Sequence, residues 1–196
     1  IFGFAAVLYS VTVQDTNFCS TTTSITLTQP DPINPVANIP NPNGYNIACF
    51  GGSTGSISLT VTGGTGAFTY LWSGPGAPFG NVSSISNLIA GTYTVKITDA
   101  NGCFTSDTSF TLTQPNAIFV NDSIITLSGC NGAAGGSIKG IATGGVGGYT
   151  YSWNTNPAQL TQIASNLVGG TYTVFVSDAN NCQAQATATI PTLPPL

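Results

Sequence analysis

An all-β chain built of tandem sandwich modules is predicted by three features of the sequence. These are a repeat of about eighty residues, apolar residues at alternate positions, and abundant glycine and proline. Residues 91–103 return as residues 170–182, and a fainter copy stands at residues 9–19. Self-similarity at a fixed period indicates an array of like modules. The 24 glycines and 12 prolines supply turns between short strands.

Two proline-containing segments divide the repeat into modules. Residues 29–32 read Gln-Pro-Asp-Pro, and residues 114–116 read Gln-Pro-Asn. We expect the C-terminal part of a truncated module at residues 1–30, and complete modules at residues 31–115 and 116–196. Both ends of the sequence are therefore expected to be cut from a longer polypeptide. The proline-rich joints are expected to limit bending between modules.

Alternation of apolar and polar residues predicts the individual strands. Residues 56–61 place Ile, Leu and Val on one face, and residues 93–97 place Tyr, Val and Ile on one face. Asn101-Gly102 follows the second of these strands and is the sequence signal of a two-residue hairpin turn. About seven short strands in each module, with turns at these intervals, indicate an immunoglobulin-like sandwich.

Aromatic residues support the sandwich. The pattern Leu-x-x-Gly-Thr-Tyr at residues 88–93 returns at residues 167–172. It resembles a tyrosine corner, in which the hydroxyls of Tyr93 and Tyr172 bond to upstream backbone. A further aromatic row is expected in the core, with stacking on sugars as the alternative. Its members are Phe68, Tyr70, Trp72, Tyr149, Tyr151 and Trp153.

The five cysteines follow the repeat. Cys49 and Cys130 precede a Gly-Ser-Ile strand, whereas Cys103 and Cys182 follow a Tyr-x-Val strand. We expect one disulfide inside each complete module, joining Cys49 to Cys103 and Cys130 to Cys182, with Cys19 unpaired by truncation. Each would be worth about 4 kcal/mol in the chain-entropy model. Paired cysteines indicate an oxidising, extracellular compartment; the alternative is five buried free thiols.

Scarce charge excludes several functions. The chain has two Lys and six Asp residues, and it has no Arg, Glu or His. Phosphate neutralisation needs many basic side chains, so no nucleic-acid partner is expected. The serines and threonines have no His or Lys base in register, so we expect no enzyme and no cofactor. No apolar run approaches the length of a membrane helix, so no membrane insertion is expected of this segment.

Two further sets of residues are candidate sites. Asp15, Asp99 and Asp178 recur at the same place in each repeat. We favour a brace of the Asx-turn type, and a calcium site with backbone and Asn oxygens is the alternative. Phe175 takes the outward-facing position that Lys96 fills in the preceding module. It is a candidate lateral contact with a neighbouring module or chain, although scattered exposed apolar residues are common.

Three motifs together resemble the SprB-type repeat. They are Cys-x-Gly-Gly-x-x-Gly-Ser-Ile from Cys49, Val-Thr-Gly-Gly-Thr-Gly-x-Phe-Thr-Tyr-x-Trp at residues 61–72, and Leu-x-Ala-Gly-Thr-Tyr-Thr-Val-x-Ile-Thr-Asp-Ala-Asn-Gly-Cys at residues 88–103. This repeat occurs in tandem in very large surface proteins of Bacteroidetes, including gliding-motility adhesins exported by the type IX secretion system. The resemblance implies an extracellular stalk or filament segment whose partners are adjacent repeats of the same chain. For such a source, Asp-Ser-Ile at residues 122–124 fits a short pattern for O-glycosylation, at Ser123.

Three alternative functions remain open. A ligand-binding module would hold surface glycans in aromatic or Asn-rich loops. A self-assembling fibre subunit would pair its exposed strand edges with a neighbouring chain or filament. A spacer would connect to a catalytic domain elsewhere in the parent chain.

Overall fold

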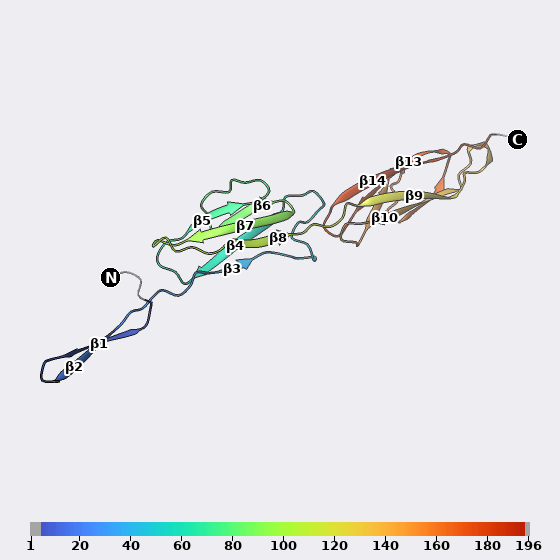
Figure 1. Cartoon of the computed structure of the whole chain (residues 1–196). Coiled ribbons are helices and arrows are strands. Elements are labelled where there is room, and N and C mark those ends of the chain that lie inside the picture. Colours follow the sequence, from blue (N-terminus) through green and yellow to red (C-terminus); the bar gives the residue numbers. More distant parts are fainter. Residues whose placement is uncertain (1–4, 195–196) are drawn as a thin grey trace.

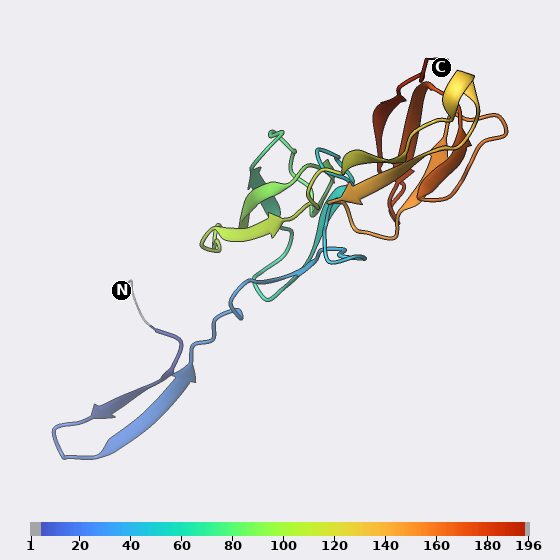
Figure 2. The ribbon, with the colours of Figure 1, turned by 90° about the vertical axis from the view of Figure 1, so that its right-hand side faces the viewer.

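A hairpin and two β-sandwiches lie end to end in the computed structural model, which describes residues 5–194 (Figure 1). The hairpin consists of β1 (Leu8–Gln14) and β2 (Ser20–Thr26). The same succession is visible after a quarter turn, with the hairpin and the second sandwich at opposite ends (Figure 2). The outermost residues of the expected modules, 1–4 and 195–196, lie outside the described residues.

The first sandwich has two antiparallel three-stranded sheets. One sheet has the order β3-β4-β6, and the other has the order β5-β7-β8. The strands are β3 (Asn34–Asn38), β4 (Gly55–Thr62), β5 (Thr69–Ser73), β6 (Ser84–Leu88), β7 (Gly91–Thr98) and β8 (Thr108–Leu112). The all-β, immunoglobulin-like prediction is confirmed, with six strands in place of about seven.

The second sandwich repeats this topology. Its sheets have the orders β12-β10-β9 and β11-β13-β14. The strands are β9 (Phe119–Thr126), β10 (Gly136–Thr143), β11 (Thr150–Trp153), β12 (Ile163–Leu167), β13 (Gly170–Ser177) and β14 (Gln183–Ile190), and a short 3-10 turn, η1 (Cys130–Gly132), precedes β10. The two sandwiches therefore match strand for strand, although the lengths of some strands and connections differ.

Each sandwich buries the residues that alternation selects. Ile57 and Val95 are fully buried in the first core, as are Ile138 and Val174 in the second. The aromatic row also contributes to the two cores, which confirms its core placement. The tryptophans at the ends of β5 and β11 are buried, and their indole N–H groups donate to the carbonyls of residues 82 and 161, at 2.8 and 3.0 Å. A buried indole therefore keeps its hydrogen-bond partner in both modules.

The turn after β7 differs from the predicted two-residue hairpin. Residues 99–107 separate β7 from β8, and only Gly102 of the Asn101-Gly102 pair has a positive φ, of 80°. Thr98 still pairs with Phe104 in an isolated bridge, so the turn itself has five residues, 99–103. Within it the Asp99 carboxylate accepts backbone hydrogen bonds from Asn101 and Cys103, both at 2.9 Å. The chain winds around this side chain, so the turn is longer than backbone pairing alone requires.

Tyrosine corners are present in both sandwiches. The Tyr93 hydroxyl donates to the Ile89 carbonyl at 2.9 Å, and the Tyr172 hydroxyl donates to the Val168 carbonyl at 3.0 Å. The two sites differ in burial, because Tyr93 has no exposed surface whereas Tyr172 is half-buried. Burial also raises the pKa of the Tyr93 hydroxyl above its ordinary value.

Replacing each corner tyrosine by phenylalanine is expected to destabilise the first sandwich more than the second. Tyr93→Phe leaves the Ile89 carbonyl without its donor beside a fully buried ring, a loss of about 1–2 kcal/mol. Tyr172→Phe removes a hydrogen bond that is more exposed, so water replaces the lost donor more easily. Urea unfolding of the two variants measures the difference, and equal losses would contradict the role of burial.

The hairpin β1–β2 is the counterpart of β7–β8. Tyr9 pairs with Ile25 in the hairpin, as Tyr93 pairs with Phe110 in the first sandwich. Val11 and Val13 of β1 lie on the face that corresponds to the core-facing side of β7, but they are 55% and 61% exposed. Among residues 5–194, no second sheet covers this face of the hairpin.

Candidate functional site

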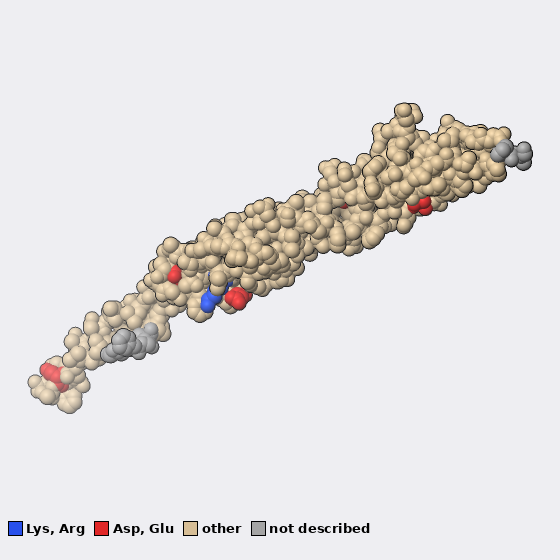
Figure 3. Space-filling view, turned by 90° about the horizontal axis from the view of Figure 1, so that it is seen from above, with Lys and Arg blue, Asp and Glu red and all other residues tan. Residues whose placement is uncertain are grey.

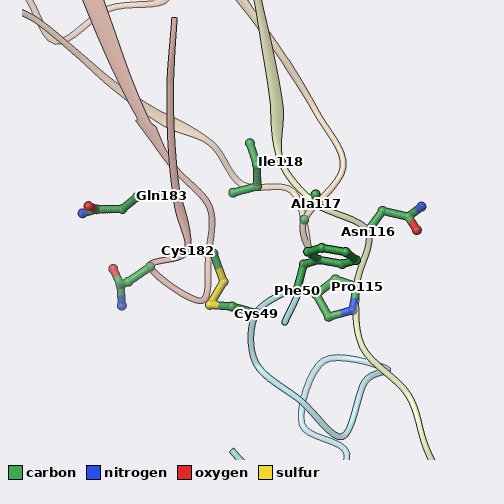
Figure 4. Close-up of a pocket in the computed structure, with 10 residues that line it drawn as sticks. Cys49, Phe50, Pro115, Asn116, Ala117, Ile118, Cys182 and Gln183 are labelled. Carbon is green, nitrogen blue, oxygen red and sulfur yellow. A yellow bond between two sulfur atoms is a disulfide. The ribbon is translucent and has the colours of Figure 1, made fainter. Parts of the chain in front are cut away.

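The joint between the two sandwiches is covalent. Cys49 of the first sandwich and Cys182 of the second form a disulfide, with their Cα atoms 5.6 Å apart (Figure 4). The expected pairings of Cys49 with Cys103 and of Cys130 with Cys182 are therefore wrong. Cys103 and Cys130 are free and exposed, as is Cys19.

The pairing within a module fails because its two cysteines lie at opposite ends of the sandwich. The Cys49 turn contacts residue Gln114, whose Oε1 accepts the Gly51 N–H at 2.8 Å. Gln114 follows β8, whose last residue pairs with the first residue of β7. Cys103 follows the other end of β7, and that eight-residue strand is roughly 23 Å long at ~3.3 Å per residue. Disulfides need Cα atoms within about 7 Å.

A buried aspartate holds the turn that presents Cys182. Oδ1 of Asp178 accepts the backbone N–H groups of Asn180 at 2.9 Å and Cys182 at 3.0 Å. Oδ2 accepts the Val146 N–H at 3.0 Å, which ties the turn to the loop between β10 and β11. The Asp178 side chain is only 4% exposed. One carboxylate therefore fixes both the shape and the position of the cysteine turn.

The other repeats use the same brace. Oδ1 of Asp99 accepts two N–H groups of its own turn, and Oδ2 accepts the Thr65 N–H at 2.9 Å. In the hairpin, Oδ1 of Asp15 accepts the N–H groups of Asn17 at 2.8 Å and Cys19 at 2.9 Å. These bonds confirm the Asx-type brace. In residues 5–194, no three metal-binding side chains gather at one place.

Asparagine side chains add polar contacts across the joint. Nδ2 of Asn180 donates to the Ala48 carbonyl at 2.8 Å, directly before Cys49. Oδ1 of Asn180 faces Nδ2 of Asn43. Sequence reasoning missed both contacts, although Asn two positions after the brace aspartate recurs at residues 17, 101 and 180. That recurrence is the signal from which the contact was predictable.

A cavity of about 440 Å³ adjoins the disulfide. Three segments form its walls: the Cys49 turn, the linker between the sandwiches, and the Cys182 turn (Figure 4). The linker is held by the Gly145 N–H, which donates to the Asn116 carbonyl at 2.9 Å. The lining residues are Cys49, Phe50, Pro115, Asn116, Ala117, Ile118, Gly145, Asn181, Cys182 and Gln183. The joint thus gathers the two cysteine turns and the linker around one cavity beside the disulfide.

Removal of the Asp178 carboxylate is expected to weaken the second sandwich. Asp178→Ala leaves three backbone N–H groups without their charged acceptor, a loss of about 3 kcal/mol or more. Asp122→Ala is the matched control, because Asp122 is exposed on β9 and its loss is expected to change stability by about 0.5 kcal/mol at most. Urea unfolding under oxidising conditions compares them. Similar midpoints for the two variants would refute the brace.

The other candidate residues lie away from the joint. Phe175 points outward from β13 and is 49% exposed. Ser123 is exposed on β9, an outer strand of its sheet. Lys96, the counterpart of Phe175, lies over the Phe104 ring, with Nζ 3.9 Å from the ring centroid. The structure brings none of these residues together with the disulfide.

The molecular surface carries very little charge. On the face in Figure 3, acidic and basic side chains form a few isolated spots on an otherwise uncharged surface. Polar contacts between modules must therefore come from amide, hydroxyl and backbone groups, as they do at the joint. Within residues 5–194, no helix has the length and apolar character to cross a membrane.

Comparison with protein families finds the SprB repeat twice, at residues 45–77 and 126–158. Each match begins near the early cysteine of a sandwich and ends beyond β5 or β11. The match bears out the resemblance seen in the sequence motifs. No curated protein matches the chain.

Several solved structures resemble the chain at low identity. Three N-terminal domains of the outer capsid protein Hoc of bacteriophage RB49 match with 18% identity and a TM-score of 0.48, covering 82% of this chain and 58% of that one. A Ca²⁺-stabilised adhesin that helps an Antarctic bacterium to bind ice matches with 19% identity and a TM-score of 0.43, covering 96% and 57%. The amphioxus IgVJ-C2 molecule matches with 13% identity and a TM-score of 0.30, covering 64% and 88%. The chain thus spans less than two thirds of the first and second of these proteins.

Proposed function

Because the chain carries two SprB repeats, we propose that it is a structural segment of a stalk or filament in a large secreted adhesin at the cell surface. The segment supports adhesion or gliding motility by setting the distance between the surface and the adhesive part of the protein. Its role is mechanical, and its partners are the adjacent repeats. Export by a type IX system and an extracellular location belong to the same proposal.

The observation that carries the proposal is the covalent joint. The sandwiches lie end to end, so every module adds its length to the molecule (Figure 1). The disulfide Cys49–Cys182 and the contacts of Asn180 restrain the angle between them. A proline-containing linker forms a third wall of the joint. Such a joint serves a rod better than a flexible string of domains.

The sparse charge supports the same role. The chain has two basic and six acidic residues, so its surface makes few charge–charge interactions, which are the ones that dissolved salt weakens. Contacts between neighbouring modules rest on buried apolar area, amide hydrogen bonds and the disulfide. The rod would therefore keep its shape over a wide range of ionic strength.

Labelling of the source cells tests the proposal. Antibodies raised against the 196-residue chain are expected to label filaments that project from the surface of intact cells. The same antibodies, or their monovalent fragments, are expected to impair attachment or gliding. Label that appears only after permeabilisation would overturn the surface location, and surface label without an extended filament would overturn the stalk.

A self-assembling fibre subunit is a second candidate, favoured by the exposed apolar face of β1–β2. An uncovered sheet face and its strand edges are available to a neighbouring chain. Sedimentation of the purified chain over a range of concentrations distinguishes the two functions. A monomer throughout supports the stalk, whereas growing linear oligomers that persist in reductant support the fibre.

A further inference from the structure

Cys103 lies in a surrounding that matches the one around Cys182. The segments around it are the linker Gln29 to Ile33, the loop at Gly64, and its own turn from Asp99 to Phe104. Their counterparts at the joint between the sandwiches are the linker that begins at Gln114, the loop at Gly145 and the Cys182 turn. The correspondence covers the linker, the loop and the late-cysteine turn.

The hydrogen bonds that shape the two surroundings also match. The Gly64 N–H donates to the Asp31 carbonyl at 2.8 Å, as the Gly145 N–H donates to that of Asn116 at 2.9 Å. The Thr65 N–H donates to the Asp99 carboxylate at 2.9 Å, as the Val146 N–H donates to the carboxylate of Asp178 at 3.0 Å. Cys103 is therefore held in the geometry in which its counterpart forms a disulfide.

The first joint contains one more element, the turn that supplies Cys49. In that turn the Gly52 N–H donates to the Cys49 carbonyl at 3.0 Å. The turn at Cys130 repeats this bond, with the Ala133 N–H donating to the Cys130 carbonyl at 3.2 Å. Cys130 is likewise free and exposed. The chain thus presents both halves of the joint a second time, one at each end of the pair of sandwiches.

We propose that every cysteine of this repeat belongs to a joint, and that the early cysteine of each module bonds to the late cysteine of the next. Under this rule Cys103 bonds to the early cysteine of a like module whose last two strands are β1–β2. Cys130 bonds to the late cysteine of a following module. The occupant of the Cys103 site is a Cys-x-Gly-Gly turn of the kind seen at residues 49–52. The inference rests on the proposed array of modules and states how its members are joined.

Two more observations fit this occupant. The exposed face of β1 corresponds to a face of β7 that the sheet β3-β4-β6 covers completely. A sheet of that type over the hairpin would complete a sandwich whose early cysteine lies at the end nearest Cys103. Asn101, the counterpart of Asn180, is exposed and placed to donate to the carbonyl before that cysteine.

Bond formation proceeds by thiol–disulfide exchange with a small disulfide oxidant such as oxidised glutathione. The thiolate of one cysteine attacks the oxidant and releases one reduced thiol, which leaves a mixed disulfide. The thiolate of the second cysteine then attacks the protein sulfur of the mixed disulfide, which forms the protein disulfide and releases the second reduced thiol. In total the two protein thiols lose two protons and two electrons, and the oxidant takes up these protons and electrons as it becomes two thiols.

An extended chain tests the rule. A copy of residues 31–84 is placed ahead of Ile1, so that Tyr9 follows the copy at the same distance as Tyr93 follows residue 84. The copy supplies the hairpin with the counterparts of β3, β4, β5 and the first residue of β6. After oxidation with glutathione, peptide mapping without reduction is expected to find the copied Cys49 bonded to Cys103 and the original Cys49 bonded to Cys182. A bond from the copied cysteine to Cys19, or full alkylation of Cys103, would overturn the proposal.

Two controls complete the design. In the extended chain with Cys103→Ser, the copied cysteine is expected to remain open to alkylation while circular dichroism shows the same strand content. In the unextended chain at high concentration, a bond from Cys130 to Cys103 between two molecules would identify a second copy as the source of the partner module. A negative map together with labelled filaments on cells would refute the disulfide rule and leave the stalk intact.

Discussion

Pulling the oxidised chain by its two ends is expected to release no length from residues 50–181. The disulfide Cys49–Cys182 transmits the force past them, across a sequence separation of 133 residues. In reductant, or in Cys182→Ser, both sandwiches can unravel. The additional contour length is then roughly 460 Å, at about 3.5 Å for each residue. Single-molecule force spectroscopy measures this difference directly.

Cys19→Ser is the matched control for this experiment, because Cys19 is exposed at the hairpin turn and outside the disulfide. It is expected to behave as the unchanged chain does. If the oxidised chain instead showed two unfolding events of full module length, force would not pass through the disulfide. The Cys49–Cys182 bond also restricts the unfolded chain, which in the chain-entropy model stabilises the fold by about 5 kcal/mol for a loop of this size.

Gly144→Ala is expected to be among the most harmful single substitutions at the joint. A Cβ atom at Gly144 would lie 2.0 Å from the Ala117 carbonyl oxygen of the linker. The φ of +81° adds backbone strain for any residue with a side chain. Because the obstacle is backbone, the linker and the loop after β10 must move apart. Urea unfolding is expected to show a loss of about 3 kcal/mol or more, combining strain and overpacking.

Gly147→Ala separates the two causes. Gly147 has a φ of +79°, close to that of Gly144, but a Cβ there would meet nothing within 4 Å. Its expected loss is the backbone strain alone, about 1–2 kcal/mol. If the two variants lost the same stability, contact with the linker would contribute nothing. At Gly63, the counterpart of Gly144, an added Cβ would lie 2.0 Å from the Pro32 carbonyl oxygen, so the same result is expected in the first sandwich.

Local sequence patterns were sufficient to predict the strands and much of the turn chemistry. Alternation selected Ile57 and Val95 as core residues because side chains on a strand point to opposite faces in turn. The repeated Asp identified the brace because its oxygens bond to N–H groups two and four residues ahead, at Asn101 and Cys103. Both inferences depend on residues close together in sequence.

The disulfide pairing depended on the path of the whole chain. Four strands separate Cys49 from Cys103; if three simple reversals joined them, the second cysteine would return beside the first. The connection at residues 74–83, between β5 and β6, instead crosses the length of the sandwich without pairing as a strand. This additional crossing places the two cysteines at opposite ends. The two early cysteines are 81 residues apart and the two late ones 79 residues apart, and both pairings are compatible with that repeat, so the repeat spacing did not distinguish them.

The closed loop between Cys49 and Cys182 also changes what a protease does to this chain. Lys96 and Lys139 are its only basic residues, so they are its only sites for trypsin-like enzymes, and both lie inside the loop. A cut after either lysine leaves the two fragments joined through sulfur. A nicked molecule therefore keeps its full covalent mass until it is reduced, and damage at these two positions does not shed the outer part of the protein.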